Sequence, residues 1–400
     1  MQTGFLRNAV VLGLMAAVGP FAIDMYLPAL PTIAADLDAP AAAAQMTLMA
    51  FFVAFGVCQI FYGPAADMLG RKPPLYFGLI VFALGSVGCA FAPTIEWLIA
   101  FRFIQGVGAA SVMVIPRAII RDLHTGPEAT RLMALVMLVI SVSPILAPLS
   151  GSGLIVLFGW RAVFVVVAVL GLLSFAMVLF FQPETRPPEA RVRIGAGALL
   201  TGFGVLLRDP RFMGLTFIGA LGMSSFFAFL AGSSFVYIEH FGLTPTGYSV
   251  AFAVNAIGFI GASQFAGRLG ERFGMAAVIS GATLAYMALS ALLFAVTLAG
   301  VDSLAVMMAL IFVAFAAMGL VIPTTMVLAL EDHGPIAGMA SALGGTLQMV
   351  TGAGVIVLVS VFSDNTPLPM VTAIALCAAG AYVLARMTLR RDAPAPQPAE

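Results

Sequence analysis

The sequence predicts an all-α polytopic membrane protein, with twelve transmembrane helices in two pseudo-symmetric six-helix bundles. The first observation is composition: 62% of residues are hydrophobic and 9% are charged, against roughly 25% charged residues in soluble proteins. The second is a series of continuously apolar runs, each about long enough to cross a bilayer as a helix. The third is a short motif that occurs in both halves of the chain. Barrel strands would alternate apolar and polar residues instead.

The apolar runs are bounded by charged residues, proline or glycine. The first run is too long for a cleaved signal peptide and contains Pro20 and Asp24, so we predict that it is retained. The predicted spans lie near residues 7–30, 46–66, 74–93, 95–118, 132–157, 162–182, 211–237, 248–268, 275–299, 304–330, 338–362 and 368–388.

The basic residues give the predicted orientation. When the N-terminus is placed inside, sixteen Lys and Arg residues lie at the inner side, Arg161 lies outside and Arg102 lies within a span. An excess of basic residues in cytoplasmic loops is the normal pattern for membrane proteins. We therefore predict a multi-pass protein of the bacterial inner membrane, with both termini in the cytoplasm.

The longest polar stretch separates the sixth and seventh spans. It begins with "PETRPPEARVR" and continues with "IGAGALLTGFGVLL", which is too short to cross the bilayer and suits its cytoplasmic surface. The predicted organisation is a bundle over 1–182, a cytoplasmic linker with an interfacial segment over 183–210, a second bundle over 211–388 and a disordered cytoplasmic tail over 389–400.

The two predicted bundles carry a related motif after their second spans. "GPAADMLGRK" and "GRLGERFG" share a glycine–acid–glycine spacing at an offset of 204 residues. The matched positions are Gly63, Asp67 and Gly70 in the first half and Gly267, Glu271 and Gly274 in the second. Internal duplication is typical of secondary transporters, in which one half rocks against the other around a central site.

Two ionisable residues lie inside predicted spans. Asp24 is about 9 Å from the outer end of the first span, and Arg102 is about 10 Å from the same side in the fourth. Such residues are costly in a bilayer and mark functional sites. Burial favours a protonated carboxyl group, whereas a nearby arginine favours the charged form. We therefore predict that Asp24 carries a proton, which movement of the first helix against the fourth would release.

Each of these residues has a structural alternative. Pro28 can end the first helix early and leave Asp24 solvated at the membrane interface. Arg102 can be a structural residue that donates hydrogen bonds to backbone carbonyl groups of neighbouring spans.

Several motifs together resemble the major facilitator superfamily. "GPAADMLGRK" is similar to its loop motif, "RFIQGVGAA" to its span-four motif and "SPILAPLSGSG" to its span-five antiporter motif. With "DMYLPALP" and "RAIIRD", the resemblance narrows to the twelve-span drug:proton antiporters of the bicyclomycin and chloramphenicol resistance (Bcr/CflA) branch. Met68 and Ser143 depart from the family pattern, at a usually basic position and a usually glycine position respectively.

The resemblance implies roles for particular residues. Arg102 would take part in a proton relay with Gln105 as a partner. Asp67, Arg71 and Asp122 would form a cytoplasmic charge cluster that latches the two halves, with Asp67 near a helix N-terminus of the other half. Gly63 and Gly70 belong to the same gate, and its counterpart in the second half would comprise Gly267, Glu271 and Arg272. The bland alternative is that Arg71 is an ordinary inner-side basic residue.

The fifth span carries two prolines and two glycines. Prolines interrupt the backbone hydrogen bonds of a helix, and glycines permit close approach of another helix. We predict a kinked helix that seals the interface between the halves, and a simple structural kink remains the alternative. The residues are Pro144, Pro148, Gly151 and Gly153.

A substrate cavity lined by aromatic residues, methionine and a few amides is predicted, because such a lining accommodates varied ligands. The candidates are Met25, Tyr26, Phe51, Phe55, Phe226, Phe227, Phe229, Asn255 and Gln348.

The leading functional prediction is export of small amphiphilic drugs by alternating access in exchange for protons. The alternatives are a proton-coupled metabolite carrier and a membrane receptor or scaffold. The spans contain no grouping of acids or histidines that predicts an enzyme, and the three cysteines and three histidines are scattered. We expect no metal and no cofactor apart from the proton as coupling ion. The expected partners are drug substrates and the bilayer, with no nucleic acid because the net charge is zero, and the chain is expected to be a monomer.

Overall fold

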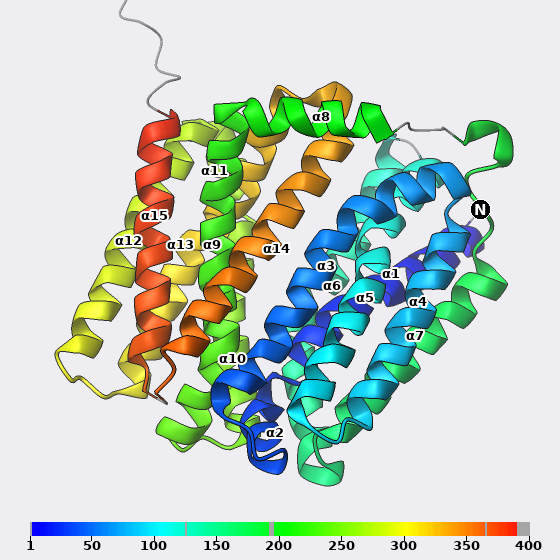
Figure 1. The fold of residues 1–400 in the computed structure, drawn as a ribbon. Helices are drawn as coiled ribbons and strands as arrows, with labels where there is room; N and C mark the ends of the chain where they lie inside the picture. Colours follow the sequence, from blue (N-terminus) through cyan, green and yellow to red (C-terminus); the bar gives the residue numbers. More distant parts are fainter. Residues whose placement is uncertain (1, 125, 192–195, 365, 390–400) are drawn as a thin grey trace, which may run out of the picture.

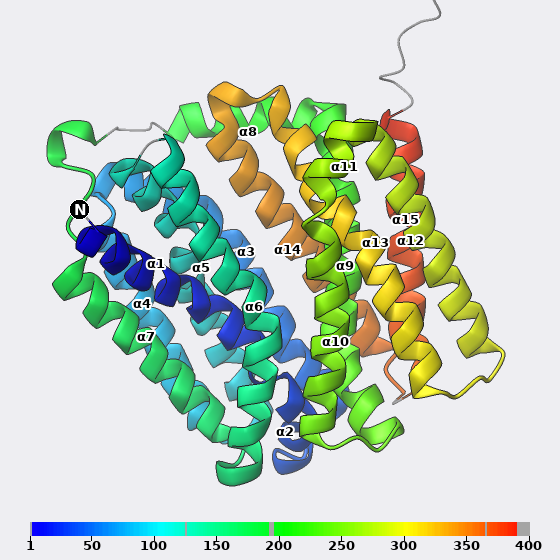
Figure 2. The ribbon, with the colours of Figure 1, turned by 180° about the vertical axis from the view of Figure 1, so that it is seen from behind.

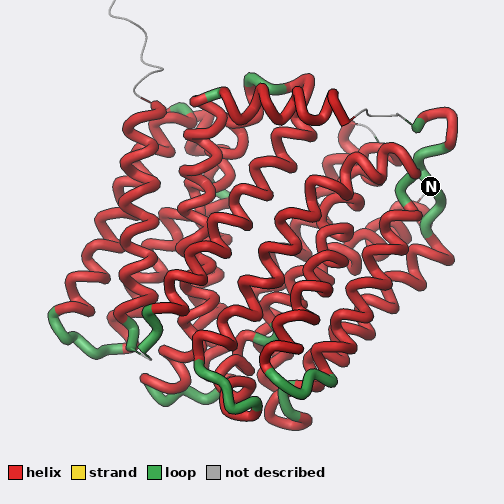
Figure 3. Tube along the Cα trace, viewed as in Figure 1, coloured by secondary structure: helices red, strands yellow, loops and turns green. Residues whose placement is uncertain are grey.

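The structure is a computed structural model that describes residues 2–124, 126–191, 196–364 and 366–389. These residues form helices and no strand (Figure 3). The helices are α1 (Gln2–Asp24), η1 (Leu27–Ala29), α2 (Leu30–Asp36), α3 (Ala41–Leu69), α4 (Lys72–Ala90), α5 (Ile95–Leu123), α6 (Gly126–Phe158), α7 (Arg161–Phe181), η2 (Pro188–Ala190), α8 (Ala196–Arg208), α9 (Pro210–Ser234), η3 (Phe235–His240), α10 (Pro245–Ser263), α11 (Ala266–Phe273), α12 (Met275–Leu298), α13 (Leu304–Glu331), η4 (Gly334–Ile336), α14 (Ala337–Val361) and α15 (Leu368–Leu389).

Twelve helical segments among the described residues are long and apolar enough to span a membrane, which confirms the predicted number. The predicted first span, 7–30, runs on to Asp36 and is broken into α1, η1 and α2. The break coincides with Pro28 and Pro31, whose missing N–H groups interrupt a helix. The predicted tail lies outside the described residues, apart from Leu389.

The helices gather into two bundles that lie side by side (Figures 1 and 2). Helices α1 and α3–α7 form the first bundle, and α9–α15 form the second. Helix α8 lies across one end of the molecule, the end that also carries the start of α1 and the end of α15. We call this end the terminal face, and the other end the opposite face.

Helix α8 has the character predicted for a segment at the membrane surface. Its Gly202 and Leu206 are buried, and the helix packs on α9 and α14. Its Leu200, Val205 and Leu207 are exposed. Exposed apolar side chains on a helix too short to cross the bilayer suit the boundary between headgroups and acyl chains.

The two bundles touch along two helix pairs, α3 with α14 and α6 with α10. The Thr346 hydroxyl donates to the Gly56 carbonyl at 2.7 Å, near the middle of both helices. A Cβ atom on Gly56 would lie 2.6 Å from the Cβ of Met349, so glycine is what allows α3 and α14 to approach. Toward the opposite face, the Ser249 hydroxyl donates to the Pro148 carbonyl at 2.8 Å.

Candidate functional site

Asp24 is the last residue of α1, at the break in the first span. The helix does end early, as the alternative based on Pro28 anticipated, yet Asp24 is only 5% exposed. Among the described residues, no side chain forms an ion pair or hydrogen bond with its carboxyl group. The C-terminal end of a helix carries partial negative charge, and burial disfavours the negative charge of a carboxylate beside it. The Asp24 carboxyl group is therefore buried at a helix end, without a side-chain partner among the described residues.

Arg102 of α5 is fully buried and reaches the same break. Its Nη1 donates to the Ala22 carbonyl at 2.9 Å and to Gln105 Oε1. The guanidinium lies 4.4 Å from the centre of the Tyr26 ring and 4.5 Å from that of Phe51. Stacking on aromatic faces and donating to a carbonyl are interactions that a planar guanidinium makes well. Arg102 Nη1 is thus bonded to the backbone of Ala22, two residues before Asp24 in the sequence, while Nε and Nη2 have no hydrogen-bond partner among the described residues.

The hydrogen bonds continue from Arg102 into the first bundle. Gln105 Nε2 donates to the Ser86 hydroxyl at 2.7 Å, which in turn donates to the Phe82 carbonyl at 2.7 Å. Gln105 is therefore hydrogen-bonded to Arg102, the residue with which the resemblance pairs it. The carbonyl-bonded arginine of the structural alternative is also present, and the relay role stays a prediction. Ser86 was missed, because a serine in an apolar run carries no distinguishing pattern.

The break in the first span also contacts α6 and the second bundle. A Cβ atom on Gly151 would collide with the Met25 carbonyl, so this glycine lets α6 pack directly against the break. A Cβ on Gly153 would meet open space, and nothing in the packing requires glycine there. Pro144 and Pro148 both lie inside α6. Segment η1 packs on α9 and α10, which puts the break at the boundary between the bundles.

At the terminal face, Arg71 is buried and joins two carboxylates. Its Nη1 lies 2.8 Å from Asp67, and its Nε and Nη2 lie 2.7 and 3.1 Å from the two oxygens of Asp122. The backbone N–H groups of Arg71 and Lys72 donate to Glu184 at 2.8 and 3.0 Å. We call Asp67, Arg71, Asp122 and Glu184 the Arg71 cluster. The pairing of Arg71 with both oxygens of Asp122 is bidentate, which is the strong form of an arginine–carboxylate bond.

Glu184 was missed by the sequence analysis. Partial burial alone would raise its pKa, but the N–H groups of Lys72, Arg71 and Arg186 and the charge of Arg191 outweigh that effect and hold the pKa below its ordinary value. Its carboxylate supplies acceptors for N–H groups at the start of α4, which such groups otherwise lack. The sequence shows only an acid in a proline-rich linker, and nothing in its spacing points to α4.

Asp67 and Arg71 also border a cavity of about 310 Å³. Its walls come from α3, α5, α8 and the start of α14, so it lies between the bundles at the terminal face. We call it the terminal cavity. Asp67 shares this cavity with Ile336 and Gly338 beside the N-terminus of α14, whereas the partners of Arg71 belong to the first bundle and the linker. The predicted latch between the halves stays a prediction.

The second-half counterpart is arranged differently. Gly267, Glu271 and Arg272 are all exposed. The Arg272 guanidinium lies 5.2 Å from the centre of the neighbouring Phe273 ring, and within the described part of the chain neither Glu271 nor Arg272 forms an ion pair.

Most of the predicted cavity residues are packed in the interior of the molecule. Met25, Tyr26, Phe51, Phe55, Phe227, Phe229 and Asn255 are buried, and Phe226 is half-buried. The rings of Phe52 and Phe227 stack at 4.2 Å, which joins α3 to α9. The Asn255 amide donates to the Tyr237 hydroxyl at 3.4 Å. Their role in substrate binding stays a prediction.

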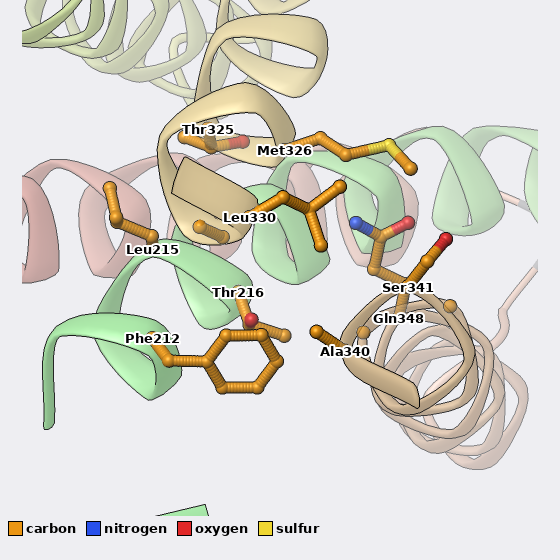
Figure 4. Close-up of a pocket in the computed structure, with 12 residues that line it drawn as sticks. Phe212, Leu215, Thr216, Thr325, Met326, Leu330, Ala340, Ser341 and Gln348 are labelled. Atoms are coloured by element: carbon orange, nitrogen blue, oxygen red, sulfur yellow. The ribbon is translucent and has the colours of Figure 1, made fainter. Parts of the chain in front are cut away.

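Gln348 lines a small pocket between α9, α13 and α14, with room for about 30 Å³ (Figure 4). Gln348 and Ser341 of α14 line it on one side and Thr216 of α9 on the other, among apolar side chains such as Leu330. This volume suits one water molecule rather than a drug.

No group of three or more His, Cys, Asp or Glu side chains that could hold a metal ion is found in the described ranges. The twelve spans and the buried charges instead suit a membrane protein that moves a solute past ionisable groups.

Comparison with known proteins gives consistent results. The profile described as Major Facilitator Superfamily matches residues 12–357. The chain is 35% identical over 367 residues to the uncharacterised MFS-type transporter YdgK of Bacillus subtilis, covering 91% of each chain. It is 31% identical over 369 residues to a bicyclomycin resistance protein homolog of Haemophilus influenzae, covering 92% of each.

A solved structure shares the fold. A bacterial homolog of the human lysosomal transporter Spinster, crystallised in an inward-facing, unoccupied conformation, aligns with a TM-score of 0.72 and 17% sequence identity, covering 99% of each chain. The family profile and the close relatives span nearly the whole chain, and the fold agrees. This protein therefore belongs to the Major Facilitator Superfamily of membrane transporters.

Proposed function

We propose that this transporter exports small amphiphilic drugs in exchange for protons, by alternating access. The observation that carries the proposal is Asp24, a buried carboxyl group at the broken end of α1, where α5, α6 and the second bundle meet. A carboxyl group in such a place changes its affinity for a proton when the helices around it move. The relative named for bicyclomycin resistance supports a drug as the substrate.

The proposed orientation places the terminal face in the cytoplasm of a bacterial cell, at the inner membrane, because the basic residues of the chain gather there. The terminal cavity would then open toward the cytoplasm, while the contacts of Ser249 and Thr346 close the path to the outside. Drug would enter the cavity from the cytoplasmic side. Proton binding at Asp24 from the outside would accompany its release. The proposal includes a monomer as the working unit, the proton as the sole coupling ion, and no nucleic acid partner.

The test uses the full chain reconstituted in vesicles that carry a pH-sensitive dye. Addition of drug should cause proton movement with the wild type, and Asp24→Asn should abolish it. The matched control is Asp36→Asn, which removes an acid of the same span that is exposed and paired with Arg161 at 2.6 Å. We expect this control to keep proton movement. Unchanged proton movement in Asp24→Asn would rule out the coupling role.

A further inference from the structure

The terminal cavity has the size and shape of a binding site. Its volume of about 310 Å³ reaches the lower end of the range of about 300–1,000 Å³ that small-molecule sites occupy. The α3 wall presents Gln59, Gly63 and Asp67, which are four residues apart and therefore share one face of the helix. The cavity extends about two helical turns along this face, from Asp67 near the terminal face to Gln59 deeper in the membrane.

Polarity changes along the cavity. Asp67, Arg71 and Arg121 border its outer part, where charges of both signs are present. Apolar side chains from three other elements, including Val114, Phe203 and Ala342, line the remainder. The deep end contains no charged residue among the described lining residues, and Gln59 is its polar group. A molecule that fills this space must therefore be largely apolar, with an uncharged polar group at its leading end.

Gln59 has unused hydrogen-bonding capacity. It is 8% exposed, and its Nε2 has no hydrogen-bond partner among the described residues. A buried donor without an acceptor is unfavourable, and a ligand oxygen that accepts from it recovers that loss. The carboxamide already lies close to α14, because a Cβ atom on Gly345 would be 3.2 Å from Gln59 Oε1.

The pocket beyond Gly345 also contains uncharged polar side chains. Gly345 also lines the small pocket that contains Thr216 and Gln348 (Figure 4). Gln59 of α3 thus lies against Gly345 of α14, and Gly345 also lines the pocket to which α9 contributes Thr216 and α14 contributes Gln348. An uncharged hydrogen-bonding group of a ligand is accommodated here better than a full charge, whose desolvation no opposite charge would offset.

We infer that the terminal cavity binds neutral amphiphiles that carry a carbonyl or similar hydrogen-bond acceptor, and that Gln59 recognises this acceptor. The inference rests on the proposed function, since it assigns a substrate class to the transport path. It places recognition on the α3–α14 pair, at a residue that the sequence analysis did not select, one helical turn from the predicted Phe55.

The test measures binding of two probes to the purified full-length protein in detergent. Chloramphenicol is neutral and carries an amide, whereas tetraphenylphosphonium is an apolar cation without a hydrogen-bond acceptor. Gln59→Met keeps the size of the side chain and removes the amide. We expect it to weaken chloramphenicol binding about five- to tenfold, the usual effect of one lost hydrogen bond, and to leave tetraphenylphosphonium binding unchanged.

The matched control is Gln45→Met. Gln45 lies on the same helix, is buried and also has an unpartnered amide atom, yet it is absent from the lining of the terminal cavity. We expect it to bind both probes as the wild type does. Equal chloramphenicol binding by the wild type and Gln59→Met would overturn the inference. So would a loss of chloramphenicol binding in Gln45→Met as large as that in Gln59→Met.

A second variant covers misfolding of Gln59→Met, which loss of tetraphenylphosphonium binding would reveal. Gly345→Ala keeps Gln59 and displaces its amide, so it should lower chloramphenicol binding selectively; unchanged binding would overturn the inference. Vesicle efflux separates the two proposals. If the wild type exports chloramphenicol and Gln59→Met exports it equally well, only the inference fails. If the wild type exports neither probe, the proposed function fails and the inference with it.

Discussion

The loop after the second span of each bundle invites comparison, because the backbone repeats while the side chains do not. Gly70 and Gly274 both end a helix with positive φ, at +94° and +83°. In the first loop Arg71 is buried in the Arg71 cluster, whereas in the second loop Arg272 is exposed. Internal duplication has thus kept the turn in both halves, and the charge cluster has formed only where another helix and the linker supply acids. The glycine turn connects consecutive spans in both halves, whereas the Arg71 cluster is present only in the first half.

Removal of Arg71, the cation of the Arg71 cluster, should have the largest effect on stability and transport. Arg71→Ala leaves Asp67 and Asp122 without their shared partner. We expect a loss of about 3 kcal/mol in stability, the lower end for a broken buried pair because both carboxylates are partly exposed, and at least tenfold slower transport. Thermal unfolding in detergent and vesicle efflux measure the two effects. Arg272→Ala is the control, and an equal loss there would contradict the comparison.

Alanine at the two turn glycines should have the next largest effect. Both Gly70→Ala and Gly274→Ala force a side chain into a backbone region that costs roughly 1–3 kcal/mol. Gly70→Ala should cost more, since its Cβ would lie 2.7 Å from Glu184 Oε2, whereas a Cβ on Gly274 meets open space. Thermal unfolding of both purified variants makes the comparison. A larger loss of stability for Gly274→Ala would show that Glu184 moves away from the new side chain at position 70 at little cost.

Loss of the linker acid should have a smaller effect, with a distinctive pH dependence. Glu184→Gln should cost about 1 kcal/mol at pH 7, in the range of a helix cap. The pKa of Glu184 is lowered in the folded protein. Its contribution is therefore complete above the unfolded value of about 4.3 and disappears as pH falls through the lower, folded value. Unfolding curves at pH 7 and at decreasing acidic pH should show wild type and variant converging. A gap that stays constant would exclude a role for the charge.

The smallest effect is expected in the second loop. Glu271→Gln removes an exposed carboxylate without an ion-pair partner in the described part of the chain, so stability should change by about 0.5 kcal/mol or less. Asp67→Asn, at the equivalent position, should cost more because it loses the 2.8 Å pair with Arg71. Efflux rates of the two variants complete the pair, and equal rates would show that both loops act alike.

Hydropathy was sufficient to predict the twelve spans, because the bilayer imposes length and composition directly; the interfacial position of α8 stays a prediction. The repeat at Gly70 and Gly274 was visible because a turn with positive φ requires glycine. The pairing of Asp67, Arg71 and Asp122 came from the family resemblance. Glu184 joins them through the path of the linker in three dimensions, which no local spacing encodes.

The candidate site was predicted less completely. Asp24 and Arg102 stood out because charge is rare in a span, and Pro28 indicated the break in the first helix. The terminal cavity and Gln59 were not found. Which part of the boundary between two bundles is open depends on how the bundles tilt, and the predicted Phe227 lies in a closed part, stacked on Phe52. Hydrophobic pattern alone does not distinguish the two parts.

The contacts of Glu184 have a mechanical consequence for the connection between the bundles. Glu184 accepts hydrogen bonds from the backbone N–H groups of Arg71 and Lys72. The part of the linker that is free to move between the bundles therefore begins after Glu184 and not at the end of α7. The segment through which a tilt of the first bundle would act on α8 is therefore shorter than the 182–195 connection between α7 and α8. Insertion of residues just after Glu184 would lengthen this segment without changing either bundle.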